Sequence, residues 1–180
     1  MKIKEVVCGT LNINGGGANH LRRIQVKNLV FQKHIDICLL QETHITETAQ
    51  PEWLRPNKGQ CFFSNLSSVS MGVAFLLRPG FVPDSCNFHE IVKGHLASLE
   101  LVYRGFHLTL LNVYAPSSSV ARNDFFIRLA NYLHTIPFDH CVCIGGDFNC
   151  TFEPNLDRNT REPHPEAHKD ISLFHITWSA

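Results

Sequence analysis

The sequence predicts an α/β domain whose mixed sheets are covered by helices. Segments typical of strands and helices follow one another in the order strand, helix, strand, several strands, helix, strand, with no internal repeat. The 180 residues fit one domain, and a chain of this size buries about 70% of its unfolded surface. With 44% hydrophobic and 18% charged residues, the composition is that of a globular protein rather than a disordered one.

The N-terminal part predicts a strand, a helix and a second strand. EVVCGTLN, residues 5–12, is rich in β-branched side chains and reads as the first strand. Leu21, Ile24 and Phe31, with basic residues between them, indicate a moderately amphipathic helix. IDICLL, residues 35–40, is an almost continuous apolar run, as expected of a strand buried on both faces.

Short strands separated by turns are expected next. The candidates are residues 62–63, 72–77, 96–103 and 106–114. Arg104-Gly105 indicates a tight hairpin between the last two, and Pro116 ends the final one. A helical stripe follows, formed by Phe126, Leu129, Ala130 and Leu133. The apolar run at 141–144 is the last expected strand. We expect residues 1–158 to form the domain and residues 159–180 an irregular tail.

Polar side chains lie where four of the predicted strands end. They are Asn12, Glu42, Tyr114, and Asp147 with Asn149. If these strands share one direction, their ends meet at a single edge, where open α/β sheets place ligand sites. Carboxylate and amide oxygens suit Mg²⁺ or Mn²⁺, which points to metal-assisted hydrolysis of a phosphoester. The same residue types also serve as ordinary turn residues after a strand, so that interpretation stays open.

Four motifs carry a resemblance to a known family. They are LNINGG at 11–16, LLQETH at 39–44, LNVYAPSS at 111–118 and GGDFNC at 145–150. In this order they resemble the endonuclease/exonuclease/phosphatase superfamily. The further motif NLDRNTR, at 155–161, resembles the endonuclease domain of LINE-type (non-LTR) retrotransposons. The resemblance implies a four-layer α/β/β/α sandwich of two packed mixed sheets, and a Mg²⁺-dependent endonuclease that nicks DNA to leave a 3′-hydroxyl.

The resemblance also implies a role for each strand-end residue. Glu42 would ligate the catalytic Mg²⁺, and Asn12 would support the metal and the phosphate. Tyr114 would contact the scissile phosphate. Asp147 would orient or deprotonate the attacking water, and Asn149 would hold the phosphate in line. Positioning and electrostatic stabilisation make up most of phosphoryl-transfer catalysis, and these residue types can supply both.

One element of the family pattern is absent. The family has a late Ser-Asp-His motif, and no such triplet occurs in this sequence. The resemblance therefore implies a chain truncated at its C-terminal end, with the last strands of the sandwich missing. Two alternatives to an active endonuclease stay open: an impaired family member that only binds metal or nucleic acid, and a phosphatase or phosphodiesterase acting on small phosphates.

Charge and cysteine content limit the partners. The formal net charge is zero, so any nucleic-acid contact must come from a local patch, for which the candidates are Arg22, Arg23 and Arg158. DNA is the expected substrate, and no obligate protein partner is evident for what we expect to be a monomer. The seven cysteines include no CxxC pair, which favours a reducing intracellular compartment, nuclear or cytoplasmic. No apolar run approaches the length of a membrane span, and no convincing signal peptide is present.

Overall fold

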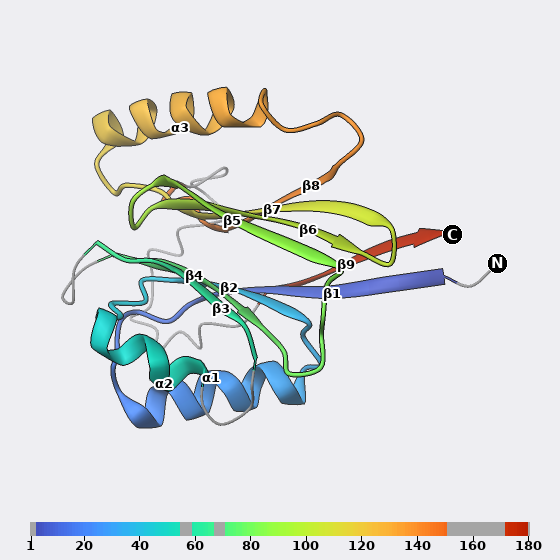
Figure 1. The fold of residues 1–180 in the computed structure, drawn as a ribbon. Coiled ribbons are helices and arrows are strands. Elements are labelled where there is room, and N and C mark those ends of the chain that lie inside the picture. Colours follow the sequence, from blue (N-terminus) through green and yellow to red (C-terminus); the bar gives the residue numbers. More distant parts are fainter. Residues whose placement is uncertain (1–2, 55–58, 67–70, 151–171, 180) are drawn as a thin grey trace, which may run out of the picture.

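A computed structural model describes residues 3–54, 59–66, 71–150 and 172–179. Two mixed β-sheets pack face to face, with helices on their outer faces (Figure 1). The arrangement confirms the expected α/β sandwich. The fold subdivides into a five-stranded sheet, which we call sheet A, and a four-stranded sheet, which we call sheet B.

Sheet A has the strand order β3-β4-β2-β1-β9. Its strands are β1 (Ile3–Asn12), β2 (Ile37–Gln41), β3 (Cys61–Ser64), β4 (Val73–Leu77) and β9 (Ser172–Ser179). β1 and β2 are parallel, and the other pairs are antiparallel. Every residue of β2 and β4 is buried, because both strands lie inside the sheet and are covered on both faces.

Sheet B has the order β5-β6-β7-β8. Its strands are β5 (Ser85–Val92), β6 (Leu96–Tyr103), β7 (Phe106–Tyr114) and β8 (Cys141–Asp147). The first three form an antiparallel meander with a tight turn at Arg104-Gly105, as predicted. The last pair, β7 and β8, is parallel, and α3 (Ser119–Leu133) connects the two strands.

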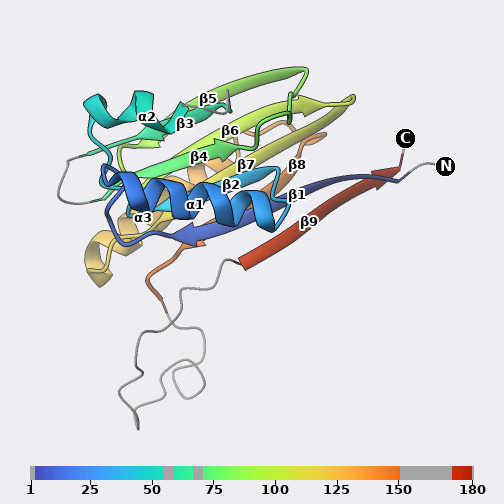
Figure 2. The same cartoon turned by 90° about the horizontal axis from the view of Figure 1, so that it is seen from below.

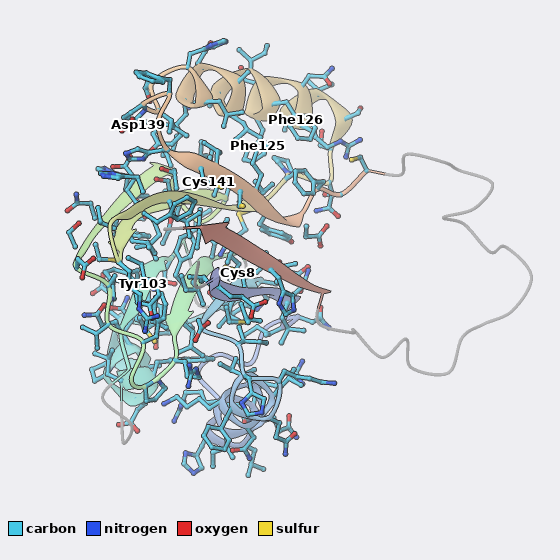
Figure 3. All side chains as sticks on the ribbon, turned by 90° about the vertical axis from the view of Figure 1, so that its right-hand side faces the viewer. Cys8, Tyr103, Phe125, Phe126, Asp139 and Cys141 are labelled. Carbon is cyan, nitrogen blue, oxygen red and sulfur yellow. The ribbon has the colours of Figure 1, made fainter. Side chains whose placement is uncertain are left out.

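Helices cover the outer faces. α1 (His20–Gln32), the one-turn 3₁₀ helix η1 (Glu47–Ala49) and α2 (Gln50–Leu54) lie on the sheet A side, and α3 lies on the sheet B side (Figure 1). The Asn19 side chain caps α1 by accepting hydrogen bonds from the backbone amides of Leu21 and Arg22. The main core lies between the sheets. Cys8 of β1 belongs to it and Cys141 of β8 packs against it (Figure 3).

Three details differ from the sequence-based expectations. Residues 172–179 form β9 alongside β1, so the expected irregular tail is wrong over that range (Figure 2). β5 was not predicted, because its exposed outer positions hide the pattern of a half-buried edge strand. α1 buries Val26 and Val30, whereas Leu21 and Phe31 are 68% and 71% exposed. These three features depend on tertiary packing, so the local pattern of apolar residues did not reveal them.

Candidate active site

Strand register brings the predicted polar residues to one edge of the sandwich. In sheet A, Asn12 pairs with Gln41, the last residue of β2, so Glu42 follows at the same edge as Asn12. In sheet B, the parallel pairing of β7 with β8 sets Tyr114 opposite Asp147. Each pair marks the carboxyl ends of two parallel strands, where the side chains leave the packed core.

A single amide joins the two sheets at this edge. The Nδ2 group of Asn12 donates one hydrogen bond to Glu42 Oε1 and one to Asp147 Oδ2, each 2.8 Å long. The Oδ1 atom of Asn12 accepts from the backbone amide of Asn14 at 2.9 Å, which fixes the orientation of the amide plane. The two carboxylates, which would otherwise repel each other, are therefore bridged by a shared donor.

The phenol of Tyr114 completes the group. Burial, the negative charge of Glu42, a hydrogen bond donated to that carboxylate and the charge of Asp147 together raise the pKa of Tyr114 to about 12. The phenol is consequently protonated at neutral pH and presents a hydrogen-bond donor. Four predicted residues, from β1, β7, β8 and the end of β2, thus converge.

The fifth predicted residue, Asn149, is anchored next to Asp147. Its backbone amide donates to Asp147 Oδ1 at 3.0 Å, and its side-chain amide donates to the carbonyl of Ala115 at 2.7 Å. Asn149 has a φ of 48°, and Glu42 has a φ of 49°. Left-handed backbone is uncommon for residues other than glycine and tends to cluster at functional sites. Here it occurs directly after the end of β2, at Glu42, and two residues after the end of β8, at Asn149.

Gly146 is required by the close approach of β8 to β7. Its φ is +144°, and an added Cβ would lie 1.9 Å from the carbonyl oxygen of Val113. A side chain at this position would displace the strand directly before Asp147. The glycine of the GGD motif therefore sets the position of the carboxylate.

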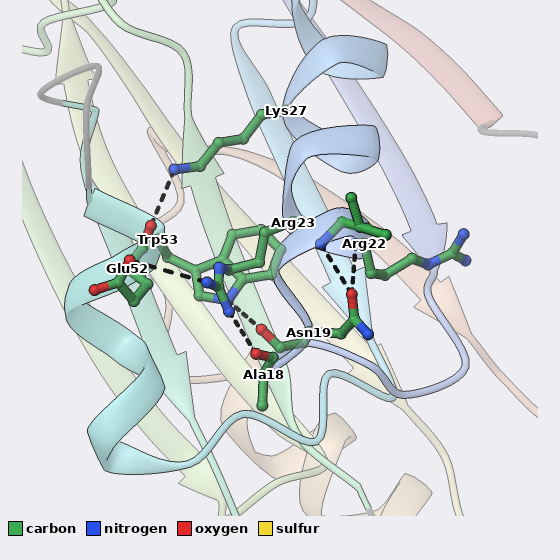
Figure 4. A network of polar contacts seen from close by, with 9 residues as sticks. Ala18, Asn19, Arg22, Arg23, Lys27, Glu52 and Trp53 are labelled. Carbon is green, nitrogen blue, oxygen red and sulfur yellow. Dashed lines mark hydrogen bonds and ion pairs between the residues drawn. The ribbon is translucent and has the colours of Figure 1, made fainter.

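Three hydrogen bonds beneath the edge hold the loop that follows β1. The backbone amides of Gly15 and Gly17 donate to the carbonyls of Glu42 and Thr43 at 2.6 and 3.0 Å. The Trp53 indole donates to the carbonyl of Gly17 at 2.9 Å (Figure 4). This loop and the turn after β2 are thus joined, which restrains the backbone at Glu42.

The two basic candidates on α1 have different surroundings. Arg23 donates to the carbonyl of Ala18 at 2.6 Å and lies 3.9 Å from the Glu52 carboxylate, with its side chain only 9% exposed (Figure 4). The expectation that Arg23 contacts nucleic acid is therefore wrong, because its guanidinium is packed against Ala18 and Glu52. Arg22 is half-buried and donates to the carbonyl of Ile13 at 3.2 Å, beside a shallow hollow of about 430 Å³ that is also lined by Asn14 and Gly16. Arg158 lies outside the described residues.

Sequence reasoning missed a buried polar link under the site. Gln41 Nε2 donates to Asn112 Oδ1 at 2.7 Å, and Asn112 Nδ2 donates to the carbonyls of Leu40 and Ala74. These bonds join sheet B to two strands of sheet A. The available signal was Asn112, a polar residue in the strand FHLTLLNVY at an alternate position on the same face as the core residues Leu108 and Leu110. His95, whose ring stacks on that of Tyr114, was also missed.

The donor chemistry fits a hard divalent cation. Glu42 and Asp147 place two carboxylates on either side of the Asn12 amide nitrogen, and the Asn12 amide oxygen accepts from the backbone of Asn14. The described part of the chain contains no cluster of three His, Cys, Asp or Glu residues able to hold a metal by themselves. Mg²⁺ commonly binds through one or two carboxylates and takes its remaining ligands from water and substrate phosphate.

Comparison with known proteins identifies relatives of this chain. The chain is 37% identical over 150 residues to the "Transposon TX1 uncharacterized 149 kDa protein" of Xenopus laevis, which covers 83% of this chain and 11% of that one. An AP endonuclease from Archaeoglobus fulgidus superposes with a TM-score of 0.65 at 21% identity, over 83% of this chain and 59% of that one. TDP2 of D. rerio, solved with a single-strand DNA product, gives 0.61 at 16% identity, over 86% and 64%.

The molecule therefore has the α/β sandwich fold of these solved structures, with a polar site at one sheet edge. The sequence matches the Endonuclease/Exonuclease/phosphatase family over residues 9–169, and the chain belongs to that family. The chain spans about one tenth of the transposon protein's length. None of the described helices is long and apolar enough to cross a membrane.

Proposed function

We propose that this chain is a Mg²⁺-dependent endonuclease of the retrotransposon type, which nicks a DNA strand and leaves a 3′-hydroxyl. The observation that carries the proposal is the Asn12 amide, which bridges Glu42 and Asp147 at 2.8 Å each. It gathers a metal-binding carboxylate and a water-orienting carboxylate from two different sheets. The 37% identity to a transposon protein supports the retrotransposon branch.

Glu42 and Asn12 are the residues that would hold Mg²⁺. Bound there, Mg²⁺ would supply the positive charge that stabilises a phosphate undergoing substitution. The left-handed backbone at Glu42, and the hydrogen bonds that join it to the loop after β1, keep the Glu42 carboxylate directed toward the edge of the sandwich. Preorganised charge of this kind provides much of the rate enhancement in phosphoryl transfer.

The remaining residues handle the water and the phosphate. Asp147 accepts hydrogen bonds at both carboxylate oxygens, from Asn12 and from the Asn149 backbone, so its orientation is fixed for accepting a proton from water. Tyr114 is protonated at neutral pH, and in our proposal its single O–H turns from Glu42 to a phosphate oxygen when the substrate binds. Asn149 carries a second amide hydrogen beyond the one bound to Ala115, and that hydrogen is directed to the phosphate in our proposal.

DNA is the proposed substrate. A solved relative contains a single-strand DNA product and another is an AP endonuclease, and both share this fold. Arg22, which is half-buried beside the hollow next to the site, is the described cation that we propose to contact a DNA phosphate. We retain Arg158 as a proposed DNA contact on the basis of its motif alone.

A plasmid-nicking assay with Mg²⁺ tests the proposal. The chain should convert supercoiled DNA to the nicked form, and Glu42→Gln and Asp147→Asn should each lower the rate by about 10²–10⁴-fold. Glu90→Gln removes an exposed carboxylate from the edge strand β5, two strands from β7 in sheet B, and serves as the matched control with unchanged rate.

Three other outcomes would contradict the proposal. Folded protein that binds DNA or Mg²⁺ without any nicking would identify an impaired family member that only binds. Hydrolysis of an inositol phosphate or another small phosphomonoester, with supercoiled plasmid left intact, would identify a small-phosphate phosphatase. Nicking that persists in both site variants would show that the carboxylates bridged by Asn12 do not carry the chemistry.

A further inference from the structure

His95 makes a set of contacts that all converge on Tyr114. It lies at the end of the turn between β5 and β6, directly before Leu96, which pairs with Val113 in the sheet ladder. The backbone amide of Tyr114 donates to the His95 carbonyl at 2.7 Å. The His95 Nδ1 atom lies 2.7 Å from the carbonyl oxygen of Tyr114. One residue therefore satisfies both backbone polar groups of Tyr114.

The contact between His95 Nδ1 and the Tyr114 carbonyl shows which ring nitrogen carries a proton. A carbonyl oxygen can only accept a hydrogen bond, so Nδ1 of His95 must carry the proton and donate it to Tyr114. This donor is present in both the neutral Nδ1–H form and the imidazolium form. The bond therefore does not depend on the charge of His95.

The imidazole also stacks on the phenol. The ring centroids of His95 and Tyr114 are 5.7 Å apart with an interplanar angle of 10°. The ring of Phe125, from α3, contacts His95 at 6.3 Å and 60°. Buried Phe125 thus restricts the imidazole, and the imidazole in turn restricts the plane of the phenol that donates to Glu42.

The turn that carries His95 is attached to sheet A. The Gly94 backbone amide donates to the Ser64 hydroxyl at 2.8 Å, and the Gly94 carbonyl accepts from the Gly72 amide at 3.0 Å. Ser64 is fully buried at the end of β3. His95 is therefore held by one sheet while it holds a residue of the other, a suitable arrangement for aligning a side chain that acts between them.

We propose that His95 is a positioning residue, which holds the phenol of Tyr114 in the orientation that contacts Glu42 and the substrate phosphate. This inference rests on the function proposed above for the same site. It requires both the Nδ1–H donor and the ring of His95. Each can be removed separately, because His95→Asn keeps an amide donor near the place of Nδ1 while His95→Phe keeps a stacked ring.

The test combines a spectroscopic readout with steady-state kinetics. The chain has three tyrosines, so incorporation of 3-fluorotyrosine gives three ¹⁹F resonances, and Tyr114→Phe identifies one of them. His95→Ala should move the Tyr114 resonance and leave those of Tyr103 and Tyr132 in place. His95→Asn and His95→Phe should each move it less. His107→Phe, at the far end of β7, is the matched histidine control and should leave the Tyr114 resonance unchanged.

In the nicking assay, His95→Ala should lower kcat roughly tenfold with KM for DNA unchanged, and both single-feature variants should recover part of the loss. A Tyr114 resonance that keeps its position in His95→Ala and His95→Phe overturns the proposal, as does a moved resonance with unchanged kcat. If the wild-type chain does not nick DNA, the proposed function fails, and the resonance still decides whether His95 positions Tyr114. Should His95→Ala not fold, the Asn and Phe variants give the same decision.

Discussion

Asn112→Ala tests the buried link that joins the two sheets beneath the site. The Asn112 side chain is 0% exposed. Its Nδ2 group donates to the carbonyls of Leu40 and Ala74 at 3.1 and 2.9 Å, and its Oδ1 atom accepts from Gln41 Nε2 at 2.7 Å. The substitution removes all three hydrogen bonds, and the space left between the sheets is too well packed to supply replacements.

The expected loss follows from these contacts. Each buried hydrogen bond contributes about 1 kcal/mol net, so Asn112→Ala should lower the free energy of unfolding by about 3 kcal/mol. Gln41 Nε2 retains its contacts to Thr10 and Leu39, which reduces the loss toward about 2 kcal/mol if they strengthen. At a slope of about 2 kcal/mol per molar urea, the midpoint of unfolding should fall by roughly 1–1.5 M.

Urea unfolding followed by circular dichroism measures this change. Asn87→Ala is the matched control, because Asn87 lies exposed on β5, and it should change the free energy of unfolding by no more than about 0.5 kcal/mol. A loss below about 1 kcal/mol for Asn112→Ala would refute the reasoning, since it would mean that the inter-sheet amide contributes no more than one ordinary hydrogen bond.

Two further predictions concern backbone fit and alkaline pH. Gly146→Ala should lower the free energy of unfolding by at least about 3 kcal/mol, because a Cβ would lie 1.9 Å from the Val113 carbonyl oxygen in addition to the cost of a positive φ. Gly105→Ala, with a φ of +78° and no atom within 4 Å of its Cβ, isolates the backbone cost at about 1–2 kcal/mol, and equal losses would contradict the clash. Burial raises the pKa of the Cys38 and Cys61 thiols from 9.0 to about 12, so the folded state resists their deprotonation. The free energy of unfolding should therefore be retained below pH 9 and fall as the pH rises from 9 to 12; urea titrations at stepped pH that show no fall would sink this idea.

The strand ends of the candidate site were predictable because their chemistry is local. A buried apolar run followed at once by a polar residue marks the point where a strand leaves the core, and this identified Glu42 and Asp147 without any knowledge of the fold. Their convergence required a second condition, the parallel pairing of β1 with β2 and of β7 with β8. The family resemblance supplied that condition, because composition and periodicity do not specify which strands pair.

The missed features depend on contacts between distant segments. His95 precedes Tyr114 by 19 residues and gives no local sign of stacking on it. The polar–apolar pattern of α1 did not reveal that Arg23 would turn inward, since its partner Glu52 comes from another helix. Strand β9 became a strand because β1 offers it a hydrogen-bonding edge, and tertiary context of this kind routinely overrides local propensity.

The pairing of β1 with β9 has a consequence for how the chain folds. The register joins Val6 to Ile176, and the side chains of Glu5 and His175 also form a hydrogen bond, so the first and last described strands depend on each other. Contacts between such distant residues form late, because a long loop must close before they can contribute. During synthesis, β1 can pair with β2 early but must keep its other edge open until the ribosome has passed Ser179. For that interval the nascent sheet exposes an unpaired strand, the state in which chaperone binding or aggregation competes with folding.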